Sequence, residues 1–219
     1  MKHLQKLSLA AVLSAIAGPA LAHHPLAGAP METLAHGVLS GVGHPILGFD
    51  HLGFVVLAGI AAALSGRAFL APLGYVAGML IGCLAMMAGL ALPLAEAVIA
   101  ASLLVMGYVV LSGRQMPVNT VMLAFGAFGL FHGTAFGESI VGQEAGYGLA
   151  VAFGYLLGLG VTQYLIAIAA GFVMTRIVKA TDASAIEARL AGAVIAGIGL
   201  FLSLETAEGA LFAALGLAA

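Results

Sequence analysis

Residues 147–175 read YGLAVAFGYLLGLGVTQYLIAIAAGFVMT and contain no Asp, Glu, Lys, Arg or His. About 20 consecutive apolar residues are enough to cross a bilayer as a helix. The whole chain follows the same trend, with 63% hydrophobic residues, 7% charged residues and a mean hydropathy of +1.16. Soluble domains carry about 25% charged residues. A surface with so few charges suits lipid, so the sequence predicts a membrane protein.

The chain as a whole divides into six apolar segments of this kind, separated by short breaks that contain Gly, Pro or Arg. We expect the spans at residues 38–64, 68–91, 95–112, 118–136, 147–175 and 189–206. The predicted fold is an all-α, polytopic bundle of six transmembrane helices, and residues 23–219 form a single domain. The tail beyond the last span either extends that helix or lies at the membrane interface.

The N-terminus has the pattern of a secretory signal. Lys2 and Lys6 precede an apolar stretch at 7–17, which is followed by Ala20-Leu21-Ala22. A charged start, a short apolar region and an A-x-A site are the marks of a cleavable signal peptide. We expect residues 1–22 to be removed, which places the mature N-terminus outside the cytoplasm. An uncleaved anchor helix is the alternative.

The basic residues fix an orientation for the six spans. Every Lys and Arg after the signal falls in alternate loops, at Arg67, at Arg114, and at Arg176, Lys179 and Arg189. Cytoplasmic loops of membrane proteins carry the excess of Lys and Arg. The expected location is therefore the bacterial inner membrane, as a multi-pass protein with both termini in the periplasm. The signal peptide requires the same side for the mature N-terminus.

Glycines recur every four residues in several spans. They are Gly74, Gly78 and Gly82 in the second, Gly129, Gly133 and Gly137 in the fourth, and Gly154 and Gly158 in the fifth. Small residues at this spacing allow helix backbones to touch in lipid. Three spans on each side of the centre would give two halves of opposite topology, as in inverted-repeat transporters. The two halves show no convincing match when read as sequence.

Ionisable residues lie within or beside the spans, where they are costly and by default mark function. The first span holds His44, Asp50 and His51, and the fourth ends with His132 and Glu138. In the orientation above, these groups lie in the outer half of the membrane. We expect spans one and four to build one metal site that opens to the periplasm.

Local geometry leaves some freedom in that site. His44 and His51 are nearly two turns apart and share a face of a regular helix. Pro45 interrupts that regularity, and a loosened backbone would bring Asp50 to the same place. In the fourth span, glycines are expected to end the helix, so that Glu138 folds back.

The side-chain chemistry favours a divalent transition metal. Imidazoles with carboxylates and without thiolates suit Ni²⁺, Co²⁺, Zn²⁺ or Fe²⁺. Further candidate ligands are Glu96 at the start of span three, His36, and the mature N-terminal His23 and His24. The chain has no basic run for nucleic acid and no phosphate-binding loop for nucleotides. The expected partners are therefore a metal ion and the lipid bilayer, with no organic cofactor; the oligomeric state stays open.

Two segments resemble the signatures of a known family. They are HPILGFDH at His44 to His51, and FHGTAFGE at Phe131 to Glu138. Both resemble the HupE/UreJ family of nickel permeases, and the likeness covers essentially the whole chain. The resemblance implies that His44, Asp50, His51, His132 and Glu138 handle metal, with Glu96 a further participant. It also implies transport of Ni²⁺ rather than Co²⁺, for hydrogenase or urease maturation, and no enzymatic activity.

Three other functions fit parts of this pattern. An intramembrane metal-dependent enzyme could use Glu138 as a base, although the chain lacks the H-E-x-x-H motif. A haem-binding subunit could use His51 and His132 as axial ligands. A metal-binding accessory protein could hold the ion without moving it across the membrane.

Overall fold

The computed structural model describes residues 30–142 and 147–216, and every regular element within them is helical. The elements are α2 (Leu34–Leu47), α3 (Phe49–Leu64), α4 (Pro72–Met87), α5 (Ala95–Leu111), α6 (Val118–Val141), α7 (Leu149–Phe172), the π-helical turn η2 (Val173–Ile177) and α8 (Ile186–Ala214). The predicted all-α class is confirmed. The predicted signal peptide, at residues 1–22, lies outside the described residues.

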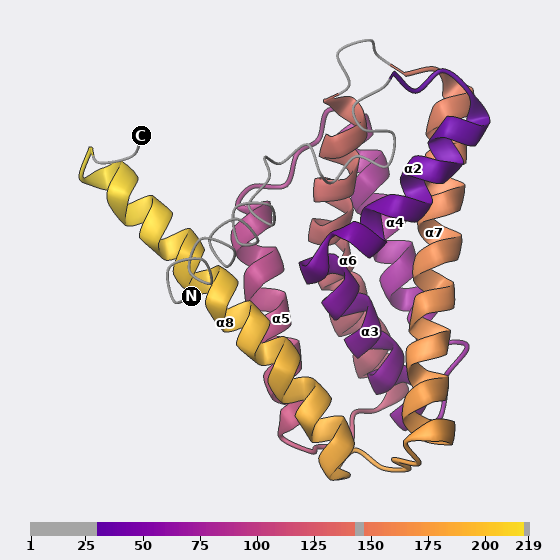
Figure 1. Ribbon diagram of the computed structural model, residues 1–219, viewed down its shortest axis with the longest axis vertical. Helices are drawn as coiled ribbons and strands as arrows, with labels where there is room; N and C mark the ends of the chain where they lie inside the picture. The colour runs from indigo at the N-terminus through magenta and orange to yellow at the C-terminus, as the bar shows by residue number, and fades with distance from the viewer. Residues whose placement is uncertain (1–29, 143–146, 217–219) are drawn as a thin grey trace, which may run out of the picture.

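The helices alternate in direction (Figure 1). In that view α3, α5 and α7 run downward, and α4, α6 and α8 run upward. Three helix pairs make the most extensive contacts: α4 with α6, α2 with α7, and α5 with α8. The α5–α8 pair leans away from the other helices toward the upper end of the view.

Glycines allow the close packing of these pairs. A Cβ on Gly78 of α4 would lie 2.0 Å from the carbonyl oxygen of Gly126 in α6. A Cβ on Gly158 of α7 would lie 2.4 Å from the carbonyl oxygen of Val38 in α2. No side chain fits at such distances, so the backbones are in direct contact. The predicted glycine faces of the second, fourth and fifth apolar segments are confirmed.

Helix length and composition identify only part of the predicted membrane topology. Three helical stretches are long and apolar enough to cross a membrane: Val118–Val141, Leu149–Ile177 and Ile186–Ala214. The bent pair α2 and α3 makes a fourth if it is counted as one span. The helices α4 and α5 are apolar but have 16 and 17 residues. These findings show a helical membrane protein, and the count of six spans stays a prediction.

The first apolar segment is not one straight helix. It bends by 83° between α2 and α3, at Gly48. Pro45 lies within the last turn of α2 and has no N–H to give to the helix ladder. Gly48 then adopts an extended backbone with φ −88° and ψ 103° before α3 begins. The loosened backbone expected here is therefore a true break.

The fourth and sixth helices run further than predicted. The expectation that glycines end the fourth helix near Gly133 and Gly137 is wrong, because α6 continues to Val141. Both glycines instead pack against α4, where a Cβ would lie 2.0 Å from the carbonyl oxygen of Met79 and 2.6 Å from the Met86 side chain. Similarly, α8 continues to Ala214, so the tail extends the last helix.

Candidate functional site

A partly open pocket of about 320 Å³ lies where α2 and α3 meet. Figure 1 shows this junction near mid-height of the bundle. Four helices and the α2–α3 break contribute to its wall. The lining residues are His44, Gly48, Asp50, His51, Glu96, Ala135, Phe136, Glu138 and Ser139. This pocket, called here the central pocket, therefore gathers two imidazoles and three carboxylates from segments far apart in the sequence.

Helix starts position two of the carboxylates. Asp50 lies in the first turn of α3, and its Oδ1 accepts a hydrogen bond of 2.8 Å from the backbone N–H of His51. Glu96 lies in the first turn of α5. The N-terminal end of a helix carries a partial positive charge, which stabilises a carboxylate there. The break before α3 thus creates the helix start that holds Asp50.

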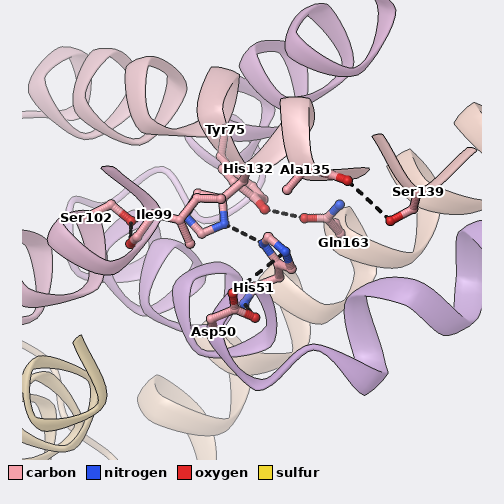
Figure 2. A network of polar contacts seen from close by, with 9 residues as sticks. All are labelled: Asp50, His51, Tyr75, Ile99, Ser102, His132, Ala135, Ser139 and Gln163. Atoms are coloured by element: carbon pink, nitrogen blue, oxygen red, sulfur yellow. Dashed lines mark hydrogen bonds and ion pairs between the residues drawn. The ribbon is translucent and has the colours of Figure 1, made fainter. Parts of the chain in front are cut away.

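The two halves of the chain meet through a pair of histidines (Figure 2). The Nδ1 of His51 in α3 lies 2.7 Å from the Nδ1 of His132 in α6. On the other edge of its ring, His51 Nε2 lies 3.8 Å from Asp50 Oδ2. The His51 side chain is 13% exposed, whereas His132 is fully buried. His51 is therefore the member of the pair that faces the central pocket.

A third residue extends the hydrogen bonds of the histidine pair. The Ser102 hydroxyl in α5 donates to the carbonyl oxygen of Ile99 at 2.6 Å, and its oxygen lies 3.0 Å from His132 Nε2. The hydroxyl has a single proton, so His132 Nε2–H donates to Ser102 when that proton goes to Ile99, and the order along the histidine pair is reversed when it goes to His132. With both rings neutral and Ser102 donating to Ile99, His132 Nδ1 accepts a hydrogen bond from His51 Nδ1–H. In this order His51 Nε2 carries the lone pair on the side facing Asp50, and in the reverse order it carries the proton.

Aromatic and polar side chains close the space behind the histidine pair. Phe54 stacks on the His132 ring with centroids 4.4 Å apart. The Tyr75 hydroxyl donates to Gln163 Oε1, and the Tyr75 ring makes an edge contact with His132. Gln163 is fully buried, and its Nε2 has no hydrogen-bond partner among the described residues. These contacts hold His132 in place behind His51.

The sequence profile of the family described as HupE / UreJ protein matches residues 10–202, which is most of the chain. The protein belongs to the HupE/UreJ family. It is 31% identical over 188 residues to Protein HupE of Rhizobium leguminosarum bv. viciae, covering 82% of this chain and 95% of that protein. No solved structure matches the chain.

In this HupE/UreJ protein, the structure brings most of the candidate metal-handling residues together. His44, Asp50, His51, Glu96 and Glu138 all line the central pocket. Three of them come from the first apolar segment, one from the third and one from the fourth, as the joint site requires. Among the described residues, no three His, Cys, Asp or Glu side chains are close enough together to hold one metal ion as they stand.

The other candidates lie elsewhere. His132 is buried behind His51, with both ring nitrogens close to polar partners, so it does not line the pocket. His36 lies in the first turn of α2, where its Nδ1 accepts from the backbone N–H of Glu32 at 3.2 Å. His23 and His24 lie outside the described residues.

The sequence reasoning missed Ser102 and Gln163. Both are fully buried and polar, and both belong to the network around His132 and Tyr75. A single Ser in an apolar helix is indistinguishable in sequence from a small packing residue. Gln163 was the better signal, since it is the only amide or charged residue in residues 147–175.

Proposed function

We propose that this protein carries a divalent transition-metal ion, Ni²⁺ in particular, across the bacterial inner membrane. The observation that carries the proposal is the central pocket, where His44 and His51 meet Asp50, Glu96 and Glu138. Ionisable groups at membrane depth are costly unless a partner compensates them. A divalent cation would neutralise two of the carboxylates, while the imidazoles supply nitrogen ligands.

The ligand set supports a metal of intermediate softness. Neutral imidazole and carboxylate ligands suit Ni²⁺, Co²⁺, Zn²⁺ and Fe²⁺, whereas thiolates favour softer ions. Cys83 is fully buried between α4 and α6 and does not line the central pocket. The preference for Ni²⁺ comes from the resemblance of HPILGFDH and FHGTAFGE to the nickel-permease signatures.

The loose arrangement of the groups supports transport rather than storage. His51 Nε2 and Asp50 Oδ2 are 3.8 Å apart, too far for a direct hydrogen bond. A structural metal site is a closed cage of four ligands with fixed geometry. A carrier must bind its ion and release it again, which a mixed site on several helices allows. The side chains would close on the ion as it enters.

The proposed topology has six spans and both termini in the periplasm, after removal of residues 1–22. Under this topology the start of α5, with Glu96, faces the periplasm, and Arg114 faces the cytoplasm. The recipient of the metal would be a hydrogenase or urease maturation system, as the family resemblance implies. A C-terminal alkaline phosphatase fusion should be active and a GFP fusion dark. The opposite result would reverse the orientation.

Uptake of radioactive Ni²⁺ into proteoliposomes tests the function directly. Purified protein should accumulate Ni²⁺ well above protein-free liposomes, and Glu138→Gln should lose most of that uptake. Glu187→Gln is the matched control, because Glu187 lies in the first turn of α8, away from the central pocket. Binding of Ni²⁺ without accumulation would instead identify a metal-binding accessory protein.

A further inference from the structure

Two of the helix pairs have the same internal geometry. In each pair, glycines on one helix approach carbonyl oxygens on the other, in parallel register. The approaches are Gly154 to Leu34 and Gly158 to Val38 in α7 and α2, and Gly74 to Met122 and Gly78 to Gly126 in α4 and α6. Adding one constant to the residue numbers of α4 gives the equivalent positions of α7. Adding a second constant to those of α2 gives the equivalent positions of α6. The pair α4–α6 therefore corresponds to the pair α7–α2.

The same shifts align the chemistry of the two halves. They place Tyr75 on Tyr155, and both tyrosines are fully buried within the pattern G-Y-x-x-G. They also place His44 on His132 and Asp50 on Glu138. The two family signatures are thus equivalent segments, each with a histidine followed six positions later by a carboxylate.

In the third pair, the two partners α5 and α8 are equivalent to each other. These helices run antiparallel, and each carries a glycine at the crossing. A Cβ on Gly107 would lie 2.5 Å from the backbone nitrogen of Ala196, and a Cβ on Gly199 would lie 2.3 Å from that of Leu104. Exchanging Gly107 with Gly199 also exchanges Leu104 with Ala196. A single difference in residue number therefore relates the contact positions of α5 to those of α8.

Two cavities are lined by equivalent residues from both halves of the chain. The apolar groove between α4 and α7 is lined by four equivalent pairs of residues. They are Leu73 with Phe153, Val76 with Leu156, Leu80 with Gly160, and Leu84 with Tyr164. The central pocket likewise contains both members of the pairs Asp50 with Glu138, Gly48 with Phe136, and His51 with Ser139. Each half therefore contributes several equivalent positions to both cavities.

The two ends of the bundle differ in spite of this correspondence. Beside the central pocket, a cavity of about 270 Å³ between α5 and α8 is lined by Leu202 and Thr206. Their equivalents, Val110 and Arg114, line a crevice of only about 10 Å³ at the other end. The break at Gly48 has no counterpart, since α6 runs unbroken through Phe136. The central pocket therefore opens toward the Glu96 end, whereas the crevice beside Ala61 holds almost no space. A separate cavity of about 380 Å³, lined by Arg114 and Thr120 among others, lies between α5 and α6 at the Arg114 end.

Aromatic side chains make the closed end. Phe54 packs against Phe125 and Phe128, with ring centroids 5.0 and 6.1 Å away, as well as against His132. The equivalent positions at the open end are Gly142, Gly37 and Ser40. The two halves therefore differ in side-chain size at these equivalent positions. The Phe54 cluster is the barrier that an ion in the pocket would have to pass.

We propose that residues 34–111 and 118–214 form an inverted repeat, with the central pocket on its pseudo-twofold axis. During transport the pocket opens alternately to the two sides of the membrane. Equivalent helices run in opposite directions, as α3 and α6 do in Figure 1, so the axis lies across the helices. Transporters built in this way alternate access by moving the repeats around a central site. In the second state the Phe54 cluster moves apart and the Glu96 end closes. This proposal rests on the proposed transport function and adds its mechanism.

Single-cysteine variants in a Cys83→Ala background test the alternation without any metal. Ala135→Cys reports on the central pocket, Thr206→Cys on the open end and Ala61→Cys on the closed crevice. A membrane-impermeant maleimide is added to right-side-out or inside-out vesicles that contain one variant each.

The alternation predicts a different labelling pattern for each variant. The Ala135→Cys variant should be labelled from both sides of the membrane. The Thr206→Cys variant should be labelled only from the Glu96 side, and the Ala61→Cys variant only from the Arg114 side. Labelling of the Ala61→Cys variant should be at least tenfold slower than that of the Thr206→Cys variant, because the crevice that Ala61 lines has almost no space for the reagent.

Each alternative gives a distinct result. A binding protein that never opens inward would leave the Ala135→Cys variant labelled only from the Glu96 side, and this would overturn the alternation. A permanently open channel would label the Ala61→Cys and Thr206→Cys variants at similar rates, which would overturn it as well. Because the labelling requires neither Ni²⁺ nor uptake, absence of Ni²⁺ transport would count against the proposed function and leave the labelling result interpretable.

Discussion

The Nδ1 atoms of His51 and His132 lie 2.7 Å apart, so one of the two rings donates a hydrogen bond to the other. When the Ser102 hydroxyl donates to Ile99, His51 is the donor. Nε2 of His51 is then the nitrogen able to bind a metal ion at the central pocket. Residues behind a metal ligand commonly fix its tautomer and orientation in this way.

The first prediction concerns the two histidines. His51→Ala removes a ligand, and His132→Ala removes the group that orients it, so each should lower Ni²⁺ uptake by about 10–100-fold. The double variant should be little worse than either single one, because residues that act as one unit are not additive. Uptake into proteoliposomes measures this, with Glu187→Gln as the control. Fully additive losses would show that the two rings act separately.

The second prediction concerns Ser102. Ser102→Ala leaves His132 Nε2–H without its acceptor, which weakens the preference for the metal-binding tautomer of His51. Ni²⁺ affinity should fall by about 10-fold, and Ser102→Thr should restore it because the hydroxyl is kept. Calorimetric titration gives the affinity, and ¹⁵N NMR of labelled histidine reports the His51 tautomer. An unchanged tautomer in Ser102→Ala would exclude this role.

The third prediction concerns pH. Imidazoles bind metal only when neutral, and an unperturbed imidazole titrates near a pKa of about 6.5. As pH falls below that value, protons compete with the metal, so affinity should drop about 10-fold per pH unit for each imidazole ligand. Ni²⁺ titrations between about pH 8 and pH 5, on either side of that pKa, measure the slope. A constant affinity over this range would argue for carboxylate ligands alone.

Much of this architecture can be predicted from the sequence, because lipid exposure imposes long apolar segments and glycines every four residues. The residues of the central pocket were also predictable, since ionisable groups in such segments have no other explanation. Gly133 and Gly137 misled the prediction of the helix end. Glycine ends helices in water by local preference, whereas here the packing of α6 against α4 requires it inside the helix.

The number of spans raised the inverted repeat as an idea, but the sequence alone could not support it. The equivalent residues are a few scattered positions, such as His44 and His132 or Tyr75 and Tyr155. The difference in residue number between equivalent positions is not the same for the three pairs of helices. A single ungapped alignment of the two halves therefore does not bring all of them together. Ser102 was equally hidden, because its role depends on a histidine 30 positions away that only the folded bundle brings within 3.0 Å.

The fourth prediction concerns the packing of α4 on α6. Gly78→Ala places a methyl group 2.0 Å from the carbonyl oxygen of Gly126, so the helices must separate. Overpacking of this kind costs about 1–3 kcal/mol. Gly197→Ala is the control, since a Cβ there meets nothing within 4 Å. Thermal unfolding in detergent should show a lower midpoint for Gly78→Ala alone. Equal midpoints would mean that α4 and α6 do not touch as described.

The fifth prediction is the position of the bound ion. Asp50 and His51 lie in α3, and Glu138 lies in α6, on opposite walls of the central pocket. Only an ion between these helices neutralises both carboxylates, which lowers the cost of placing them inside a membrane. His132 is behind His51, with Ser102 and His51 at its ring nitrogens, so it should not contact the ion.

Anomalous scattering from crystals soaked in Ni²⁺ locates the metal directly. The peak should lie about 2.0–2.2 Å from His51 Nε2, a distance typical of imidazole ligands, and next to a carboxylate of α6. Asp50→Asn should reduce the occupancy, while Asp182→Asn, in the connection between η2 and α8, should leave it unchanged. A peak that touches α3 alone would show that the first signature binds metal without the fourth helix. A peak on His132 would require the histidine pair to separate, and the tautomer order inferred from Ser102 would then be wrong.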